Sequence, residues 1–289
     1  MDNLVYHRAE TLDEVLTLLD QHGDDAKVLA GGQSLIPMMS AGLAAPRILI
    51  DINRVSGLDR VLVENREVAV GALVRHRTLE DANAEVARAI PLFPVAAPLI
   101  AHAPIRNRGT FVGSLVHADP SAEWPAVTLA TGAQIRLARR GGERTISAED
   151  FFLGPLTANI EPEELAVEVR LGTAPARTGV SVQELAYRAG DYAIVGVAAQ
   201  ISVDDAGEIA DVRLALFGVD ATPLRVTEAE AVLRDVGAAG IDEAAHIARE
   251  AVAPSSDATA SADYRRDMIN VYCRRALAEA LMRSGVPHH

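Results

Sequence analysis

The sequence has almost no cysteine and almost no lysine, and both shortages limit its chemistry. Its 289 residues include one cysteine, Cys273, so the chain cannot form an internal disulfide or a cysteine-rich zinc or iron–sulfur site. Lys27 is the single lysine, and the absence of any Gly-Lys-Ser/Thr sequence excludes a P-loop. Any redox chemistry must therefore come from an organic cofactor.

Long apolar runs are also missing, and acidic residues exceed basic ones. No segment approaches the roughly 20 uninterrupted apolar residues that cross a bilayer, and the N-terminus has no apolar signal-peptide core. We therefore expect a cytoplasmic, soluble protein without membrane insertion. The net charge of −13 repels phosphates, which argues against nucleic acid as a partner. The length predicts two or three packed units rather than one.

The N-terminal part is predicted to begin with a helix, which is followed by a strand, a glycine loop, a helical piece and a second strand. Thr11 and Glu14 have the spacing of a capping box, and the following apolar periodicity predicts a helix that ends near Gly23. The sequence then predicts strands at 27–30 and 47–52, with Gly31-Gly32 directly after the first.

The remaining patterns predict a mixed α and β chain, with a boundary between subdomains near residues 53–57 and a linker over 172–179. Alternating apolar residues predict strands, and apolar residues at helical spacing predict helices. The predicted strands cover 60–63, 67–72, 134–138, 144–147, 164–171, 194–203 and 208–217, and the predicted helices cover 78–88, 91–102, 227–235, 242–252 and 262–283.

Two glycine loops carry the strongest functional signal. In Ala30-Gly-Gly-Gln-Ser34, the glycines leave room for backbone N–H groups to face one ligand, and the Gln33 and Ser34 side chains could add donors. The second loop, Asn107-Arg-Gly-Thr-Phe-Val-Gly-Ser114, repeats the combination of glycine and hydroxyl. On its own, a Gly-Gly pair after a strand is more often an ordinary turn. Together the two loops could hold a dinucleotide, although the Gly-x-Gly-x-x-Gly fingerprint is absent.

Three segments carry a resemblance to a known family. The strings KVLAGGQSLIPMMSAGLAAPRILIDI, IRNRGTFVGSLVHADPSAEWPAV and SADYRRDMINVYCRRAL resemble the FAD-binding medium subunit of molybdenum hydroxylases, the carbon monoxide dehydrogenase and xanthine dehydrogenase family. The likeness spans nearly the whole chain. It implies an α+β fold, with a two-subdomain FAD-binding domain of the vanillyl-alcohol-oxidase (PCMH) type followed by a small α+β C-terminal domain. The expected boundaries are 1–175, with subdomains of about 1–55 and 56–175, and 176–289.

The resemblance also implies which residues bind FAD. The two loops would hold the diphosphate, Asp119 would lie near the ribose or diphosphate, and Tyr192 would cover one face of the isoalloxazine. The residues assigned to the loops are Ala30, Gly31, Gly32, Gln33, Ser34, Thr110, Phe111, Val112, Gly113 and Ser114.

One position departs from the family pattern. Val112 stands where the family usually has the first glycine of a Gly-Gly pair. Because a β-branched residue avoids a positive φ and narrows the approach of a phosphate, we expect Val112 to weaken FAD binding and Val112→Gly to strengthen it.

The function implied by the resemblance is electron transfer within a multi-subunit, heterotrimeric oxidoreductase. A large molybdopterin-binding subunit would oxidise the substrate, and a small subunit with two [2Fe–2S] clusters would pass electrons to FAD on this chain. No residue here need then act as a catalytic acid, base or nucleophile. His102, His117 and Asp119 lack an evident additional ligand, so no metal site is assigned. The alternatives are a flavin-free scaffold or partner-docking paralogue and a phosphate-binding protein unrelated to redox chemistry.

Overall fold

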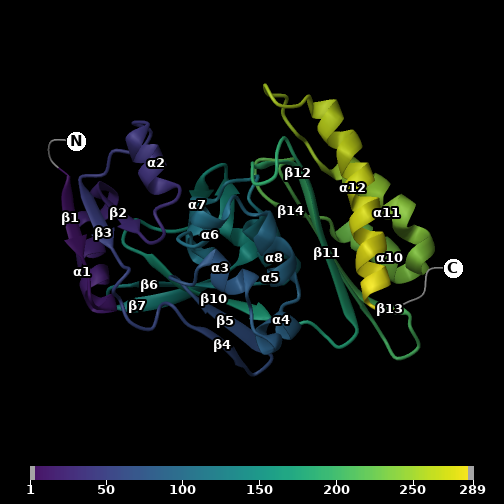
Figure 1. Cartoon of the computed structure of the whole chain (residues 1–289), viewed down its shortest axis with the longest axis horizontal. Helices are drawn as coiled ribbons and strands as arrows, with labels where there is room; N and C mark the ends of the chain where they lie inside the picture. The colour runs from purple at the N-terminus through teal and green to yellow at the C-terminus, as the bar shows by residue number, and fades with distance from the viewer. Residues whose placement is uncertain (1–3, 286–289) are drawn as a thin grey trace.

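The computed structural model describes residues 4–285 as three main sheets in a row along the long axis of the molecule (Figure 1). The N-terminal sheet lies at one end, a second sheet with many short helices lies in the middle, and a third sheet with the last three helices lies at the other end. Within the described residues, no helix is long and apolar enough to cross a membrane.

The first sheet is parallel, with the strand order β1-β3-β2. The strands are β1 (Val5–Arg8), β2 (Ala26–Leu29) and β3 (Ile48–Asp51), and the intervening helices are α1 (Leu12–His22) and α2 (Leu35–Ser40). The Thr11 hydroxyl accepts the Glu14 N–H at 3.2 Å, and Gly23 ends α1 with a φ of +46°. These contacts confirm the predicted helix and its capping residue.

The second sheet is antiparallel, with the order β4-β5-β10-β6-β7. Asn65 and Arg66 both have a positive φ, which gives the tight turn between its first two strands. Its strands are β4 (Val61–Glu64), β5 (Glu67–Gly71), β6 (Gln134–Arg139), β7 (Gly142–Ser147) and β10 (Leu165–Gly172), and a separate pair is β8 (Phe152–Gly154) with β9 (Thr157–Ala158).

Several short helices lie in the connections between the strands of the middle unit. The predicted helix at 78–88 is two helices in the structure, and the one at 91–102 is a short helix that continues into a 3₁₀ turn at Ala97–Leu99. The helices are α3 (His76–Glu80), α4 (Ala84–Ala89), α5 (Leu92–Ala96), α6 (Ala103–Arg106), α7 (Phe111–His117), α8 (Glu123–Ala130) and α9 (Ala148–Phe151).

The third sheet is antiparallel, with the order β11-β12-β13-β14. The segment predicted as a linker, 172–179, already contains the start of β11, which the sequence analysis did not anticipate. The strands are β11 (Thr178–Ala186), β12 (Ala193–Val203), β13 (Ile209–Phe217) and β14 (Leu224–Arg225), and the helices are α10 (Thr227–Val236), α11 (Ile241–Ala251) and α12 (Ala262–Arg283).

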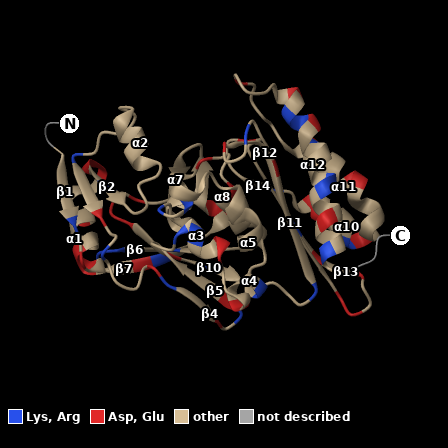
Figure 2. Cartoon of the chain, viewed as in Figure 1, with Lys and Arg blue, Asp and Glu red and all other residues tan. Residues whose placement is uncertain are grey.

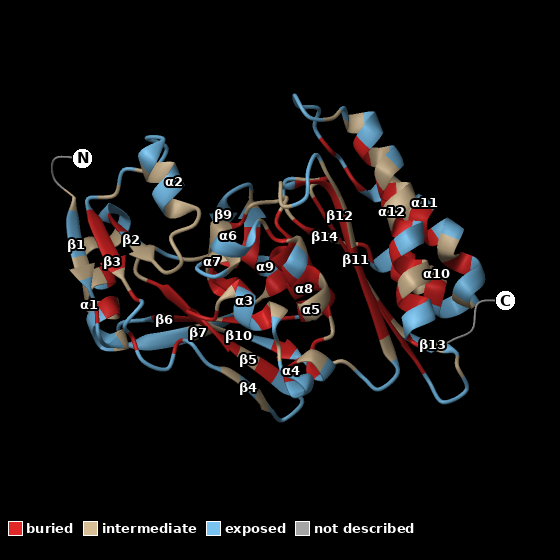
Figure 3. Ribbon diagram, viewed as in Figure 1, coloured by how far each residue is buried: buried red, intermediate tan, exposed pale blue. Residues whose placement is uncertain are grey.

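Strand β12 is buried along its whole length (red in Figure 3) because both faces of the third sheet are covered. Val195, Val197 and Ala199 belong to the core shared with the last three helices, whereas Ala193 and Ala198 belong to the core of the preceding units. Helix α12 packs on one face of this sheet and α8 on the other. The third sheet is therefore held against the middle of the molecule.

A buried arginine ties α12 to the sheet. Basic and acidic residues both occur along this helix (blue and red in Figure 2), and Arg265 near its start is only 7% exposed. Its guanidinium donates to the carbonyls of Ile194 at 2.6 Å and Gly218 at 2.9 Å, and to the carboxylate of Asp257 at 2.6 Å. These bonds fix the start of β12, beside the loop that carries Tyr192.

Candidate functional site

A cavity of about 820 Å³ is lined by residues from all three sheet units. A volume of this size is in the upper part of the range that binds organic cofactors. Eleven of the twelve residues assigned to FAD line it, and the exception is Phe111. The eleven are Ala30, Gly31, Gly32, Gln33, Ser34, Thr110, Val112, Gly113, Ser114, Asp119 and Tyr192.

The first glycine loop connects β2 to α2. Gly32 has a φ of +72°, a conformation that favours glycine, and the N–H groups of Gly32, Gln33 and Ser34 bond to no residue between 4 and 285. The Gln33 side-chain amide donates to the carbonyl of Gly31 at 3.0 Å. Gln33 therefore braces the loop in this structure, and three backbone donors are available to a ligand.

The second glycine loop leads into α7. The Thr110 hydroxyl accepts the Gly113 N–H at 3.1 Å, and a Cβ on Gly113 would lie 2.5 Å from the same hydroxyl oxygen. The N–H of Val112 has no partner among the described residues, so it is a further donor beside the cavity. Gly113 is therefore required by the cap of α7.

The expected conflict at Val112 is not present. Val112 lies within the helix α7, its φ is not positive, and its side chain is 2% exposed. The prediction that this position needs a left-handed backbone was wrong, because the segment folds as a capped helix and not as a glycine turn. The backbone-strain reason for weakened FAD binding is therefore removed, whereas Val112 still lines the cavity through which a phosphate would approach.

Phe111 does not line the cavity. Its ring is fully buried and packs edge to face against Phe93 and Trp124, with centroid distances of 5.6 and 5.1 Å. Its N–H donates to the carbonyl of Val74 at 3.0 Å, so the backbone donor is also used. Phe111 anchors the second loop to the core and is removed from the candidate ligand set.

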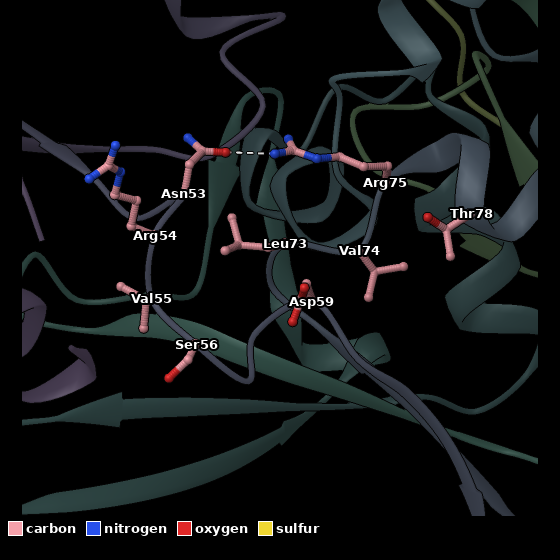
Figure 4. Close-up of a pocket in the computed structure, with 9 residues that line it drawn as sticks. All are labelled: Asn53, Arg54, Val55, Ser56, Asp59, Leu73, Val74, Arg75 and Thr78. Carbon is pink, nitrogen blue, oxygen red and sulfur yellow. Dashed lines mark hydrogen bonds between the residues drawn. The ribbon is translucent and has the colours of Figure 1, made fainter. Parts of the chain in front are cut away.

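Two side chains that the sequence analysis did not single out connect the loops. The Asn53 amide donates to the carbonyl of Ala30 at 2.8 Å, and its oxygen accepts from Arg75 at 2.6 Å (Figure 4). Arg75 also donates to the carbonyl of Arg108. The pair therefore bridges the end of β2 to the second loop, beside a smaller cavity of about 380 Å³. No local motif marks this pair, because its members are far apart in the sequence.

The wall of the main cavity is more acidic than basic. Among the described residues that line it, Lys27 is the only lysine or arginine. The acidic residues of the wall are Asp24, Asp119, Glu123, Glu161, Glu164 and Asp191. A diphosphate would therefore be bound through backbone N–H groups and not through a cluster of positive charge.

One of these acidic residues is largely neutralised by protonation. Burial, and then the nearby Glu184 carboxylate, raise the pKa of Glu123 to about 8. Burial raises the pKa of Glu184 to about 7. Glu123 is therefore largely uncharged at neutral pH. Asp119 accepts the Ser121 N–H at 2.8 Å, which fixes the turn after α7.

The C-terminal unit contributes one loop, which connects β11 to β12. Gly190 has a φ of +83°, and a Cβ there would lie 2.7 Å from Cε1 of His102. This close approach brings Tyr192, whose side chain is 60% exposed, to the rim of the cavity.

Within residues 4–285, no group of three or more histidine, cysteine or carboxylate side chains could hold a metal ion.

The residues present fit a dinucleotide with a diphosphate. Both loops offer unpaired backbone donors to one cavity, and side chains at the glycines would collide with neighbouring atoms. Residues 2–173 match the family described as the FAD binding domain in molybdopterin dehydrogenase, and residues 181–280 match the CO dehydrogenase flavoprotein C-terminal domain. The two matches define a flavoprotein with an α+β FAD-binding domain followed by a C-terminal domain, as predicted.

Similar proteins match this chain over nearly their whole length. The chain is 38% identical over 281 residues to the 6-hydroxypseudooxynicotine dehydrogenase complex subunit alpha of Paenarthrobacter nicotinovorans, covering 96% of this chain and 95% of that protein. It is 36% identical over 282 residues to the carbon monoxide dehydrogenase medium chain of Hydrogenophaga pseudoflava, covering 96% and 97%.

Solved structures agree with the sequence matches. Carbon monoxide dehydrogenase from Hydrogenophaga pseudoflava superposes with a TM-score of 0.93 at 36% identity, over 97% of this chain and 98% of that chain. Quinoline 2-oxidoreductase from Pseudomonas putida 86 superposes with a TM-score of 0.91 at 32% identity, over 98% of both chains. This chain belongs to the FAD-binding medium subunits of the molybdenum hydroxylases, and FAD is its cofactor.

Proposed function

We propose that this chain carries electrons from the [2Fe–2S] clusters of a small partner subunit to an external acceptor. In the proposed complex, a large subunit holds molybdopterin and oxidises the substrate. The observation that carries the proposal is that both glycine loops line one large cavity and that each loop has backbone N–H groups without a partner among residues 4–285. Bound there, FAD would supply the redox chemistry, since it can take electrons singly and release one or two.

In this proposal the chain's own residues bind and orient the cofactor. The N–H groups of Gly32, Gln33, Ser34 and Val112 would hold the diphosphate, and Tyr192 would lie against the ring. Asp119 and Glu123 would face the polar parts of the cofactor from the cavity wall. No residue of the chain is assigned as a catalytic acid, base or nucleophile. The domain boundaries at 1–175 and 176–289 remain predictions.

The flavin-free alternative has lost the support of backbone strain. It rested on a strained Val112, and the structure places this residue in an ordinary helix. We therefore keep FAD binding within the main cavity as part of the proposal. We expect FAD to bind non-covalently, because no sequence motif marks a histidine or cysteine for a covalent flavin linkage.

The electron-transfer proposal is tested on the purified complex. Substrate should bleach the flavin absorbance only when the cluster-containing subunit is present, and removal of that subunit should leave the flavin oxidised. Bleaching by the large subunit and this chain alone would contradict the proposed route. Acid precipitation should release the yellow chromophore, and colour retained in the pellet would contradict non-covalent binding.

A further inference from the structure

His76 is a buried histidine whose two ring nitrogens have different surroundings. It is the first residue of α3 and is 5% exposed. Trp124 donates its indole N–H to Nδ1 of His76 at 2.9 Å, so Nδ1 is an acceptor and carries no proton. A neutral imidazole with an unprotonated Nδ1 must carry its proton on Nε2.

The environment keeps this ring neutral. Burial, and then the charges of Arg106 and Arg75, lower the pKa of His76 to about 4. Both arginines have other partners, because Arg106 pairs with Glu80 and Arg75 donates to Asn53. A proton on Nδ1 would also oppose the indole donor. The ring is therefore a neutral donor through Nε2 across the physiological pH range.

The Nε2 edge lies at the second glycine loop and at the cavity wall. A Cβ on Gly109 would lie 2.6 Å from Nε2, so a glycine at this position lets the second loop pack closely against this edge of the ring. His76 and Gly109 both line the cavity. No residue between 4 and 285 accepts a hydrogen bond from Nε2. Nε2 is not among the fully buried side-chain atoms without a partner, so it keeps access to the cavity, where its N–H is available to a ligand acceptor.

We propose that His76 is a cofactor-binding residue that donates its Nε2–H to the FAD diphosphate, and that Trp124 is a positioning residue that fixes the required tautomer. The inference rests on the proposed placement of FAD in the main cavity. The diphosphate is the favoured acceptor because Nε2 adjoins Gly109, one residue before the Thr110 cap. Among residues 4–285, Lys27 is the one lysine or arginine of the cavity wall, so an uncharged N–H donor from a histidine would add to the few side-chain donors available to a phosphate there.

The first test reads the tautomer in the unmodified full chain after its flavin has been removed. Nitrogen-15 NMR of the histidine side chains should show His76 with a protonated Nε2 and a bare Nδ1, unchanged between pH 6 and 8. Both pH values lie well above the His76 pKa of about 4, so the ring should stay neutral throughout. Addition of ADP should shift the Nε2–H resonance, whereas riboflavin should shift it little. A protonated Nδ1, or no response to ADP, would overturn the inference.

The second test measures affinity with a matched pair of variants. His76→Asn keeps an acceptor near Nδ1 but removes the Nε2 donor, whereas His76→Gln places an amide N–H near Nε2. Loss of a hydrogen bond to a charged group should weaken FAD and ADP binding by roughly tenfold to a hundredfold in His76→Asn, with riboflavin little affected. His76→Gln should recover most of the affinity.

These measurements distinguish the role of His76 from the placement of FAD in the main cavity. Emission from Trp124, the only tryptophan, can follow each titration and the thermal unfolding of the flavin-free variants. Equal FAD and ADP affinity in wild type and a folded His76→Asn would overturn the role of His76 alone. Failure of the wild-type chain to bind FAD or ADP would overturn the placement of the cofactor as well.

Discussion

Gly31 and Gly109 bring the two glycine loops into backbone contact. A Cβ on Gly31 would lie 2.7 Å from the Cα of Gly109 and 2.4 Å from the carbonyl oxygen of Arg108. Neither contact can be relieved by rotating a side chain, because both involve backbone atoms. The first loop belongs to the first sheet unit and the second to the middle unit, so this contact sets the spacing between the two sets of N–H donors.

The first prediction concerns that spacing. Gly31→Ala should force the loops apart and lower FAD affinity by at least tenfold, as measured by titration of the flavin-free chain. Gly154→Ala is the control, because a Cβ there meets no atom within 4 Å and its φ is not positive. FAD affinity unchanged in Gly31→Ala would show that the contact does not set the binding geometry.

The second prediction separates a local backbone effect from a binding effect. Gly32 and Gly42 both have a φ of +72°, but only Gly32 lines the main cavity. Valine at either position should cost about 1–3 kcal/mol of stability through backbone strain. Only Gly32→Val should also lose FAD affinity, since its side chain would crowd the loop beside the donors. Equal FAD affinity in the two variants would argue against a diphosphate at this loop.

The third prediction reverses the expectation from the sequence. Val112→Gly should lower the free energy of unfolding by about 2–4 kcal/mol, because it removes a buried side chain and puts glycine in a helix. FAD affinity should not improve. Thermal denaturation and FAD titration of the variant check both statements. Tighter FAD binding would restore the interpretation of Val112 as an obstacle.

The fourth prediction tests the rim of the cavity. Tyr192→Ala should leave the chain folded and yellow but increase the fluorescence of the bound flavin, because an aromatic ring stacked on the isoalloxazine quenches it. Tyr187 lies on the same loop, is 79% exposed and does not line the cavity, so Tyr187→Ala is the matched control. Equal emission from both variants would remove Tyr192 from the flavin site.

The fifth prediction concerns pH and the flavin-free chain. The pKa of Glu123 is raised to about 8 in the folded chain from 4.5, so between these values the folded state holds more protons than the unfolded state. This group's contribution to stability therefore falls as pH rises from 4.5 to 8. Glu123→Gln should raise the melting temperature at pH 8 and change it little at pH 4. The exposed Glu161→Gln is the control, and parallel curves for both variants would contradict the prediction.

The sequence predicted local features better than long-range contacts. The Thr11 cap, the turn at Asn65 and both glycine loops depend on neighbours within a few residues, and the structure contains them. Phe111 was predicted to bind FAD because it lies within the second loop motif. Successive residues of a helix point in different directions, however, and the Phe111 ring faces the core. The Asn53–Arg75 pair has no local pattern, so it became visible only in the fold.

A structure of the chain purified with its flavin tests the central claim most directly. The account predicts that the FAD diphosphate lies between the two glycine loops, within hydrogen-bond distance of the N–H groups of Gly32 to Ser34 and of Val112. The isoalloxazine ring should lie beside Tyr192. A diphosphate bound elsewhere, for example in the smaller cavity beside Arg75, would contradict the account.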